Sequence, residues 1–144
     1  MERKIQDIKQ FNRFYLRMMG LFSMYTDVSS YSATEAMILY EISHTKNCTA
    51  SYLTNYFNFD KGYISRIIRK FSRNNVIKRR PSEEDRRVQY IELTEKGRDV
   101  LEELSFKADE NVQHMIKHVD ENDVTKLIKA MKQIELILNN NNKG

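Results

Sequence analysis

Residues 59–71 read Phe-Asp-Lys-Gly-Tyr-Ile-Ser-Arg-Ile-Ile-Arg-Lys-Phe, a capping residue followed by an amphipathic repeat. Asp60 is a favoured helix N-cap, because its carboxylate can accept a hydrogen bond from the first backbone amides of a helix. Four apolar side chains then share one helical stripe: Ile64, Ile67, Ile68 and Phe71. The basic side chains lie largely away from that stripe. The pattern predicts a helix over about residues 61–73 with one buried face and one cationic face.

A shorter helix is expected immediately before this one. Thr49 can cap a helix over residues 50–57, and Asn58-Phe59 forms a tight turn between the two helices. Two short helices joined by a turn of about three residues, the second basic on its free face, describe a helix-turn-helix.

A β-hairpin is expected directly after the basic helix. Residues 76–80 and 87–93 are interpreted as two strands, the second rich in β-branched and aromatic side chains. The segment Pro81-Ser82-Glu83-Glu84-Asp85 between them has the composition of a turn. Arg86 and Arg87 then lie at the tip of the hairpin. A winged helix-turn-helix has this order of elements.

Helices are also expected at the N-terminal side of this region. Apolar residues recur at spacings of three and four over roughly residues 3–27, which predicts one long helix. Ser32 and Glu35 form a capping box that starts a second helix. Residues 37–40 are apolar all round, so we expect this second helix to be central and buried.

Two further helices follow the hairpin. Thr94 caps a helix that continues to about His118, and residues 120–123 cap a last one with an apolar stripe to Leu138. Only four glycines and one proline occur in 144 residues, which disfavours hairpin-rich β folds. The predicted fold class is mainly α with a small β-hairpin wing.

Positive charge is concentrated in the middle of the chain. Residues 60–87 hold ten lysines or arginines and four acids, a net charge of +6 against +4 for the whole chain. A basic segment in an otherwise slightly acidic chain indicates a polyanion-binding face. The alternative is a solvated charged surface.

Composition also limits the class of protein. One cysteine excludes an internal disulfide framework and a cysteine-based zinc cluster. No run approaches the roughly 20 apolar residues of a membrane span, and the N-terminus lacks the apolar core of a signal peptide. We therefore expect a cytoplasmic protein that binds no cofactor or metal and does not associate with a membrane.

Two stretches resemble the MarR family of bacterial transcription regulators. Residues 59–71 fit the recognition helix of that family. The wing and the start of the next helix are matched by Val76-Ile77-Lys78-Arg79-Arg80-Pro81, by Asp85-Arg86-Arg87 and by Leu93-Thr94-Glu95-Lys96-Gly97. The sequence departs from the family at Asn75, where glycine is usual, and at Thr54, where a small residue is common.

The resemblance implies an organisation for the whole chain. Residues 1–144 would form one MarR-like domain, in which residues 1–30 and 98–140 are dimerisation helices and residues 32–97 are the winged DNA-binding lobe. It also implies a homodimer whose recognition helices enter the major groove of double-stranded DNA and whose wing tips reach the minor groove.

Nine residues are candidates for contact with DNA: Lys61, Gly62, Tyr63, Ser65, Arg66, Arg69, Lys70, Arg86 and Arg87. Arginine is the commonest reader of guanine, so Arg66 and Arg69, with Ser65, are candidates for base contacts, although they could touch only phosphates. Lys61 and Gly62 suit a phosphate at the helix N-terminus.

More specific expectations apply to two of these candidates and to one acidic residue of the wing. Tyr63 could touch a thymine methyl group or pack on the preceding helix. Arg86 suits a narrow minor groove. Asp85 is expected to stiffen the wing by pairing with Arg87.

The resemblance further implies a small aromatic or anionic effector at the junction of the lobe and the dimer helices. The candidate residues there are Phe22, Tyr25, Tyr31 and Tyr40, with ordinary core packing as the alternative for each.

Two other side-chain patterns could carry chemistry. Cys48 lies near a helix N-terminus and could be a redox sensor, but burial as a small hydrophobe is favoured. His114 and His118 have the spacing of metal ligands, yet they lack a third strong ligand, so no metal site is predicted.

These patterns favour a dimeric, sequence-specific DNA-binding transcription regulator, with repression and release by an effector as its expected mode. Paired carboxylates at metal spacing, a nucleophile signature and a phosphate loop are not found in the sequence, so we do not expect an enzyme. The alternatives are a partner-binding module and a nucleic-acid-acting enzyme, each using the same basic face.

Overall fold

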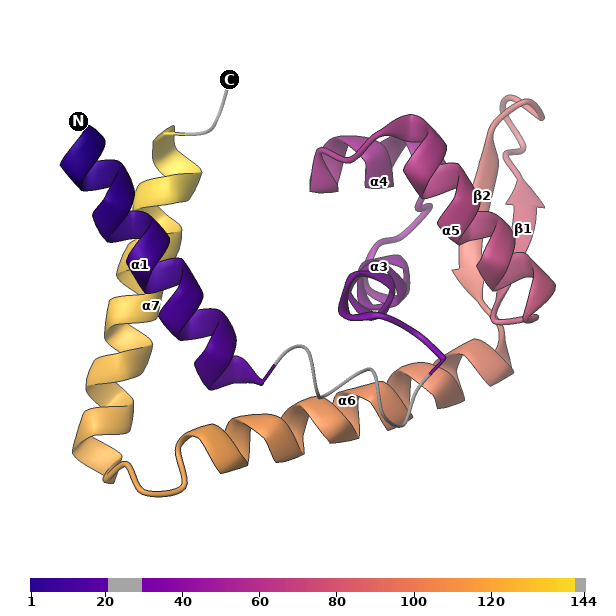
Figure 1. The fold of residues 1–144 in the computed structure, drawn as a ribbon. Helices are drawn as coiled ribbons and strands as arrows, with labels where there is room; N and C mark the ends of the chain where they lie inside the picture. Colours follow the sequence, from indigo (N-terminus) through magenta and orange to yellow (C-terminus); the bar gives the residue numbers. More distant parts are fainter. Residues whose placement is uncertain (21–29, 142–144) are drawn as a thin grey trace.

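The computed structural model describes residues 1–20 and 30–141 of the chain. In chain order the elements are α1 (Glu2–Met19), α3 (Ala33–His44), α4 (Ala50–Phe57), α5 (Lys61–Arg73), β1 (Ile77–Pro81), β2 (Gln89–Leu93), α6 (Glu95–Met115) and α7 (Glu121–Asn141) (Figure 1). The predicted fold class, mainly α with a β-hairpin wing, is confirmed.

The hydrophobic core lies in the lobe built from α3, α4, α5, the hairpin and the first turns of α6. Its largest fully buried side chains include Ile38, Leu53, Ile64 and Phe71. The loop before α4 joins this core, because the backbone carbonyl of Cys48 accepts a hydrogen bond of 2.7 Å from the Ile91 amide. The lobe therefore has its own core, on which α5 and the wing are held.

The predicted helix starts are confirmed by local hydrogen bonds. The hydroxyl of Ser32 accepts from the amide of Glu35, whose carboxylate accepts from the amide of Ser32. The side chains of Thr49, Asp60 and Thr94 each accept a hydrogen bond from the first turn of the helix that follows them. These caps fix where α3, α4, α5 and α6 begin.

Asparagines take the left-handed backbone conformation after each of the two helices of the helix-turn-helix. Asn58 closes α4 at φ 54°, and Asn75 follows α5 at φ 60°. Asparagine tolerates this region better than other residues with a side chain. Asn75 therefore provides the turn into β1 at the position where the family that the sequence resembles usually has glycine.

Several predicted bounds are wrong. The first helix ends at Met19 rather than near residue 27, because Gly20 adopts φ 61° and its amide caps the carbonyl of Arg17. The strands span residues 77–81 and 89–93, so Arg87 belongs to the turn. The helix after Thr94 ends at Met115 instead of His118.

The interior of α3 is also less uniform than predicted. Ile38 and Leu39 are fully buried, but Met37 is 52% exposed and Tyr40 is 54% exposed. The apolar run is thus shared between the core and a surface that faces α6.

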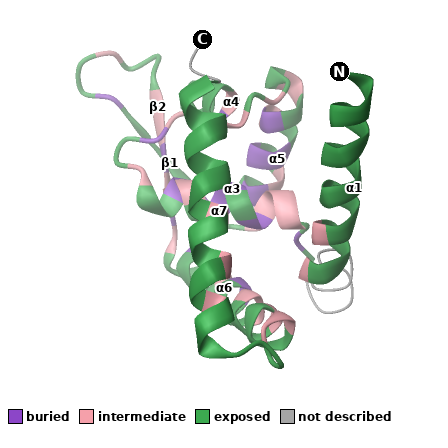
Figure 2. Cartoon of the chain, turned by 90° about the vertical axis from the view of Figure 1, so that its left-hand side faces the viewer, coloured by how far each residue is buried: buried purple, intermediate pink, exposed green. Residues whose placement is uncertain are grey.

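Outside the lobe, α1 and α7 present apolar side chains to the solvent. Neither helix has a buried residue, and Figure 2 shows both exposed along almost their whole length. The exposed apolar side chains of α1 include Ile5, Ile8, Phe11 and Phe14, and those of α7 include Ile134 and Ile137. α6 runs beneath the lobe and connects it to α7 (Figure 1). None of the helices described is long and apolar enough to cross a membrane.

Candidate nucleic-acid interface

The basic face of α5 is held outward by the packing of its opposite face. Ile64, Ile67, Ile68 and Phe71 are buried in the lobe. The side chains of Lys61, Arg66, Arg69 and Arg73 are exposed, and that of Ser65 is half-buried between them. The Asp60 carboxylate accepts a 3.0 Å hydrogen bond from the Gly62 amide at the start of this face. The helix thus offers a row of cations with a capped N-terminus.

The wing tip is a turn stabilised by its own ion pair. Strands β1 and β2 pair antiparallel from Ile77 opposite Leu93 to Pro81 opposite Gln89. In the turn, the Asp85 carboxylate accepts from the amide of Arg87 at 3.1 Å and from its guanidinium at 3.1 and 3.2 Å. These hydrogen bonds hold the pKa of Asp85 below its ordinary value. The expected pairing of Asp85 with Arg87 is therefore present.

The wing tip and the N-terminal end of α5 lie at the same end of the lobe, away from α6 (Figure 1). Arg86 is exposed at this tip, and its backbone carbonyl accepts a 3.1 Å hydrogen bond from the side-chain amide of Gln89. The structure thus brings the N-terminal end of α5 and the turn that carries Arg86 to one end of the lobe.

Arg79 is a cation of this surface that the predicted set of DNA contacts omitted. It lines a hollow of about 270 Å³ between α5 and the hairpin, together with Ser65, Arg69 and Gln89. Arg79 pairs with Ile91, a core residue, so both side chains lie on the face of the hairpin that meets α5. Side chains alternate between the two faces of a strand, so the position of Ile77 on the buried face predicts that Arg79 lies on the same face.

The other face of the hairpin holds a different cation. The Arg80 guanidinium donates to Glu92 at 2.8 Å and to Asn47 at 3.0 Å, and it lies over the ring of Tyr90. Arg80 is thereby paired on the side of the wing that faces away from α5.

Lys70 differs from the other predicted cations of α5. Its ammonium group donates to the backbone carbonyl of Ser30 at 2.9 Å and to the Glu35 carboxylate at 3.0 Å. It also lies 5.1 Å from the ring centroid of Tyr31. These contacts tie α5 to the start of α3 and direct Lys70 away from the exposed row.

Tyr63 packs within the turn rather than on the preceding helix itself. Its ring meets the edge of the Phe59 ring at a centroid distance of 5.4 Å. The side chain is 36% exposed, so part of it remains accessible at the start of α5.

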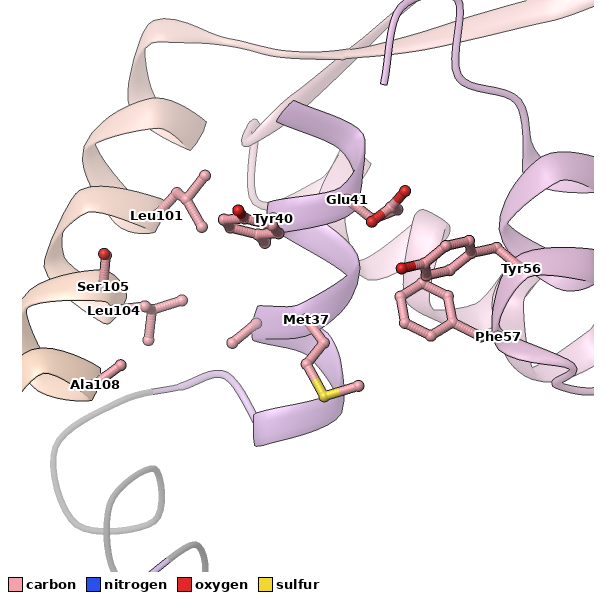
Figure 3. A pocket seen from close by; sticks show the side chains of 10 residues that line it. Met37, Tyr40, Glu41, Tyr56, Phe57, Leu101, Leu104, Ser105 and Ala108 are labelled. Carbon is pink, nitrogen blue, oxygen red and sulfur yellow. The ribbon is translucent and has the colours of Figure 1, made fainter. Parts of the chain in front are cut away.

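The candidate effector residues do not share one pocket in the described part of the chain. Phe22 and Tyr25 lie outside the described residues. Tyr31 is buried against Phe71, and its hydroxyl accepts a 3.1 Å hydrogen bond from Asn74. Tyr40 instead lines a hollow between α3, α4 and α6 (Figure 3).

Cys48 is completely buried beside the start of α4. Burial raises the pKa of its thiol to about 11, and the nearby Glu41 adds to the shift. The nearby helix N-terminus therefore does not produce a reactive thiolate. His114 is exposed on α6, and no cluster of three potential metal ligands occurs among the described residues.

A comparison with protein-family models finds a match in the lobe. The MarR family model matches residues 31–88, which run from the start of α3 to the end of the wing turn. Over this segment the chain is similar to the MarR family. The matched region contains the predicted recognition helix and both arginines of the wing tip. Comparison with curated proteins gives no significant match.

Solved structures show that the likeness extends to the whole fold. FabT from Streptococcus pneumoniae, in complex with DNA, is 19% identical with a TM-score of 0.73, over 96% of this chain and 97% of FabT. Apo MarR from E. coli is 18% identical with a TM-score of 0.73, over 90% and 94%.

BpsR from Bordetella bronchiseptica, whose DNA binding is regulated by 6-hydroxynicotinic acid, is 16% identical with a TM-score of 0.70, over 88% and 91%. The similarity of fold therefore includes α1, α6 and α7 as well as the lobe.

Proposed function

We propose that this chain is a sequence-specific DNA-binding transcription regulator that works as a homodimeric repressor. The observation that carries the proposal is that the exposed face of α5 is cationic and that the N-terminal end of this helix lies at the same end of the lobe as the turn that carries Arg86 (Figure 1). A helix with this character fits the major groove, and an arginine at a wing tip fits the minor groove. Action on DNA places the protein in the cytoplasm.

Within this interface the residues take different roles. Arg66, Arg69 and Ser65 face outward along α5 and read base edges. Lys61 and the amide of Gly62 contact a phosphate at the helix start. Arg87 keeps the wing turn closed through Asp85, whereas Lys70 holds α5 against α3.

The apolar faces of α1 and α7 support the homodimer. An exposed row such as Ile5, Ile8 and Phe11 on α1 has the spacing of a helix packed against another helix, yet it meets no core in the single chain. We assign residues 1–30 and 98–140 to dimerisation and residues 32–97 to the DNA-binding lobe. The second copy would cover these faces and place two lobes on one duplex.

Control by a small molecule is the last part of the proposal. The hollow beside Tyr40 lies between the lobe and α6, so an occupant could favour one orientation of the lobe over another. The regulation of BpsR by a small molecule supports such control in this fold.

Selection of bound duplexes from random DNA, followed by fluorescence anisotropy on the selected site, tests the proposal. We expect two half-sites about 10 bp apart and affinity that falls steeply with salt. Arg66→Ala should weaken binding and relax the preference at one base pair, whereas Lys96→Ala, an exposed lysine in the first turn of α6, should not. Equal affinity for selected and random duplexes would count against sequence-specific regulation.

A further inference from the structure

The hollow between α3, α4 and α6 has a volume of about 370 Å³, within the usual range for small-molecule sites. Met37, Tyr40 and Glu41 of α3 form its floor. Tyr56 and Phe57 of α4 stand on one side, and residues of α6, among them Leu101 and Leu104, stand on the other (Figure 3). Most of the lining is apolar or aromatic, so the hollow favours a ligand with an apolar body.

The charge of the lining is unusual for a site that would take an anion. Among the described residues that line the hollow, none is lysine, arginine or histidine, and Glu41 is the charged one. Residues 21–29, which lie outside the described part, contain no lysine, arginine or histidine in the sequence either. An anionic ligand would therefore lose its hydration without a compensating cation.

Glu41 is held in place by hydrogen bonds. Its carboxylate oxygen Oε1 accepts from the Tyr52 hydroxyl at 2.7 Å and from the Thr45 hydroxyl at 3.1 Å. The side chain is half-buried and lies beside Tyr56 in Figure 3. A positioned carboxylate next to aromatic rings is the combination that binds an organic cation, through charge and through the faces of the rings.

The adjoining hollow has the same sign of charge. It shares Tyr40, Leu101 and Ser105 with the first hollow, and its other ionisable residues are Glu102, Asp109, Arg98 and His44, whose ring stacks on that of Tyr40. The Arg98 guanidinium donates to the backbone carbonyl of Leu93 at 3.3 Å. With histidine counted as neutral at pH 7, the two acids outnumber the one arginine, so the formal charge of this neighbour is also negative.

We propose that the hollow between α3, α4 and α6 binds an organic cation with an aromatic or other apolar body, whose positive group pairs with Glu41. This differs from the aromatic or anionic effector expected from the sequence. The regulatory meaning of the site rests on the proposed function, but the binding itself does not.

Three probes that share one skeleton test the sign of the charge: 3-phenylpropylammonium, the neutral 3-phenylpropanol and the anionic 3-phenylpropanoate. Each is titrated into the isotope-labelled full chain without DNA, and the shifts of backbone amide signals are followed by NMR. We expect the cation to bind tightest, the alcohol more weakly and the anion weakest, with the largest shifts in α3 and α6.

Glu41→Gln keeps the shape and the acceptor oxygen but removes the charge. It should weaken binding of the ammonium probe by about fivefold or more and change the affinity of the alcohol by less than about twofold. Glu103→Gln is the matched control, because it removes the same charge from an exposed position of α6 outside the hollow. It should leave all three affinities unchanged.

Three results would overturn the proposal: equal or tighter binding of 3-phenylpropanoate, an ammonium affinity that Glu41→Gln does not reduce, or no binding of any probe. The last result would mean that a second copy of the chain covers the hollow. These three measurements do not depend on the affinity for DNA, which is measured separately. A chain that binds DNA but not the cation therefore contradicts this inference alone. A chain that binds the cation but not DNA contradicts the proposed function alone.

Discussion

Gly97, in the first turn of α6, lies so close to the carbonyl group of Val76 that a Cβ atom at position 97 would overlap the carbonyl oxygen. The Thr94 amide donates to this same carbonyl at 3.0 Å, and the Thr94 hydroxyl donates to the carbonyl of Asn75 at 2.7 Å. The start of α6 is thus fixed on the short segment between α5 and β1. These contacts hold the first turn of α6 against residues 75 and 76.

Gly97→Ala should therefore destabilise the protein. We expect the free energy of unfolding to fall by about 2–3 kcal/mol, because a backbone carbonyl cannot move aside as a side chain can. Urea denaturation followed by circular dichroism measures the change. Gly62→Ala is the control, since a Cβ there meets only side-chain atoms of Asp60 and Arg66. It should lower stability by much less than Gly97→Ala, because the Asp60 carboxylate, 3.0 Å from that Cβ, can shift, and equal losses in the two variants would contradict this account of the contact.

Arg69 and Lys70 are neighbours in sequence, but their substitution should have different effects. Arg69→Ala removes an exposed cation, so the slope of log affinity for DNA against log salt should decrease by about one, with stability nearly unchanged. Lys70→Ala removes two charge-assisted hydrogen bonds to Ser30 and Glu35, and should lower the free energy of unfolding by about 1–2 kcal/mol. Anisotropy at several salt concentrations and urea denaturation provide the measurements. A salt slope that changes for Lys70→Ala but not for Arg69→Ala would reverse these assignments.

The pKa of Asp85 reports on the closed wing turn. Because Arg87 lowers this pKa in the folded chain, the pairing stabilises the turn above the ordinary value of about 3.9 and is lost as the pH falls through the lowered pKa. Arg87→Gln should raise the pKa of Asp85 toward its ordinary value, whereas Arg86→Gln should not. Carboxyl carbon NMR shifts, followed from pH 7 down to pH 2, measure both. An Asp85 pKa that is identical in the two variants would argue that Arg87 does not pair with it in solution.

The local parts of the fold could be predicted because neighbouring residues determine them. Ser32 with Glu35, Thr49, Asp60 and Thr94 each hydrogen-bond within one helical turn, so a pattern three residues long predicts the helix start. The end of α1 was missed because apolar spacing continues past Gly20, while the conformation of Gly20 itself stops the helix. The spacing of apolar residues indicates which face of a helix would be buried, but it does not show where the helix ends.

The candidate site depends more on tertiary contacts, and there the sequence is less informative. Tyr31 and Tyr40 looked equivalent, but the packing of α3 places Tyr31 against Phe71 and Tyr40 in a surface hollow. The sequence predicts that Lys70 is another exposed cation of α5, whereas in the structure it pairs with Glu35 of α3. Both distinctions depend on how α3 is oriented against α5, which a single sequence does not specify.

The thiol of Cys48 should be unreactive in the folded protein. Burial raises its pKa to about 11, so at neutral pH the nucleophilic thiolate is almost absent and the reagent has no direct access. We expect reaction with an aromatic disulfide reagent to be at least about 100-fold slower in buffer than in 8 M urea, and to accelerate with pH beyond pH 9. The chain has one cysteine, so absorbance reports on this residue alone. Peroxide should likewise leave DNA affinity unchanged, in the native chain and in Cys48→Ala. Rapid labelling of the folded chain at pH 7, or a peroxide-dependent loss of DNA binding that Cys48→Ala abolishes, would instead make Cys48 a redox sensor.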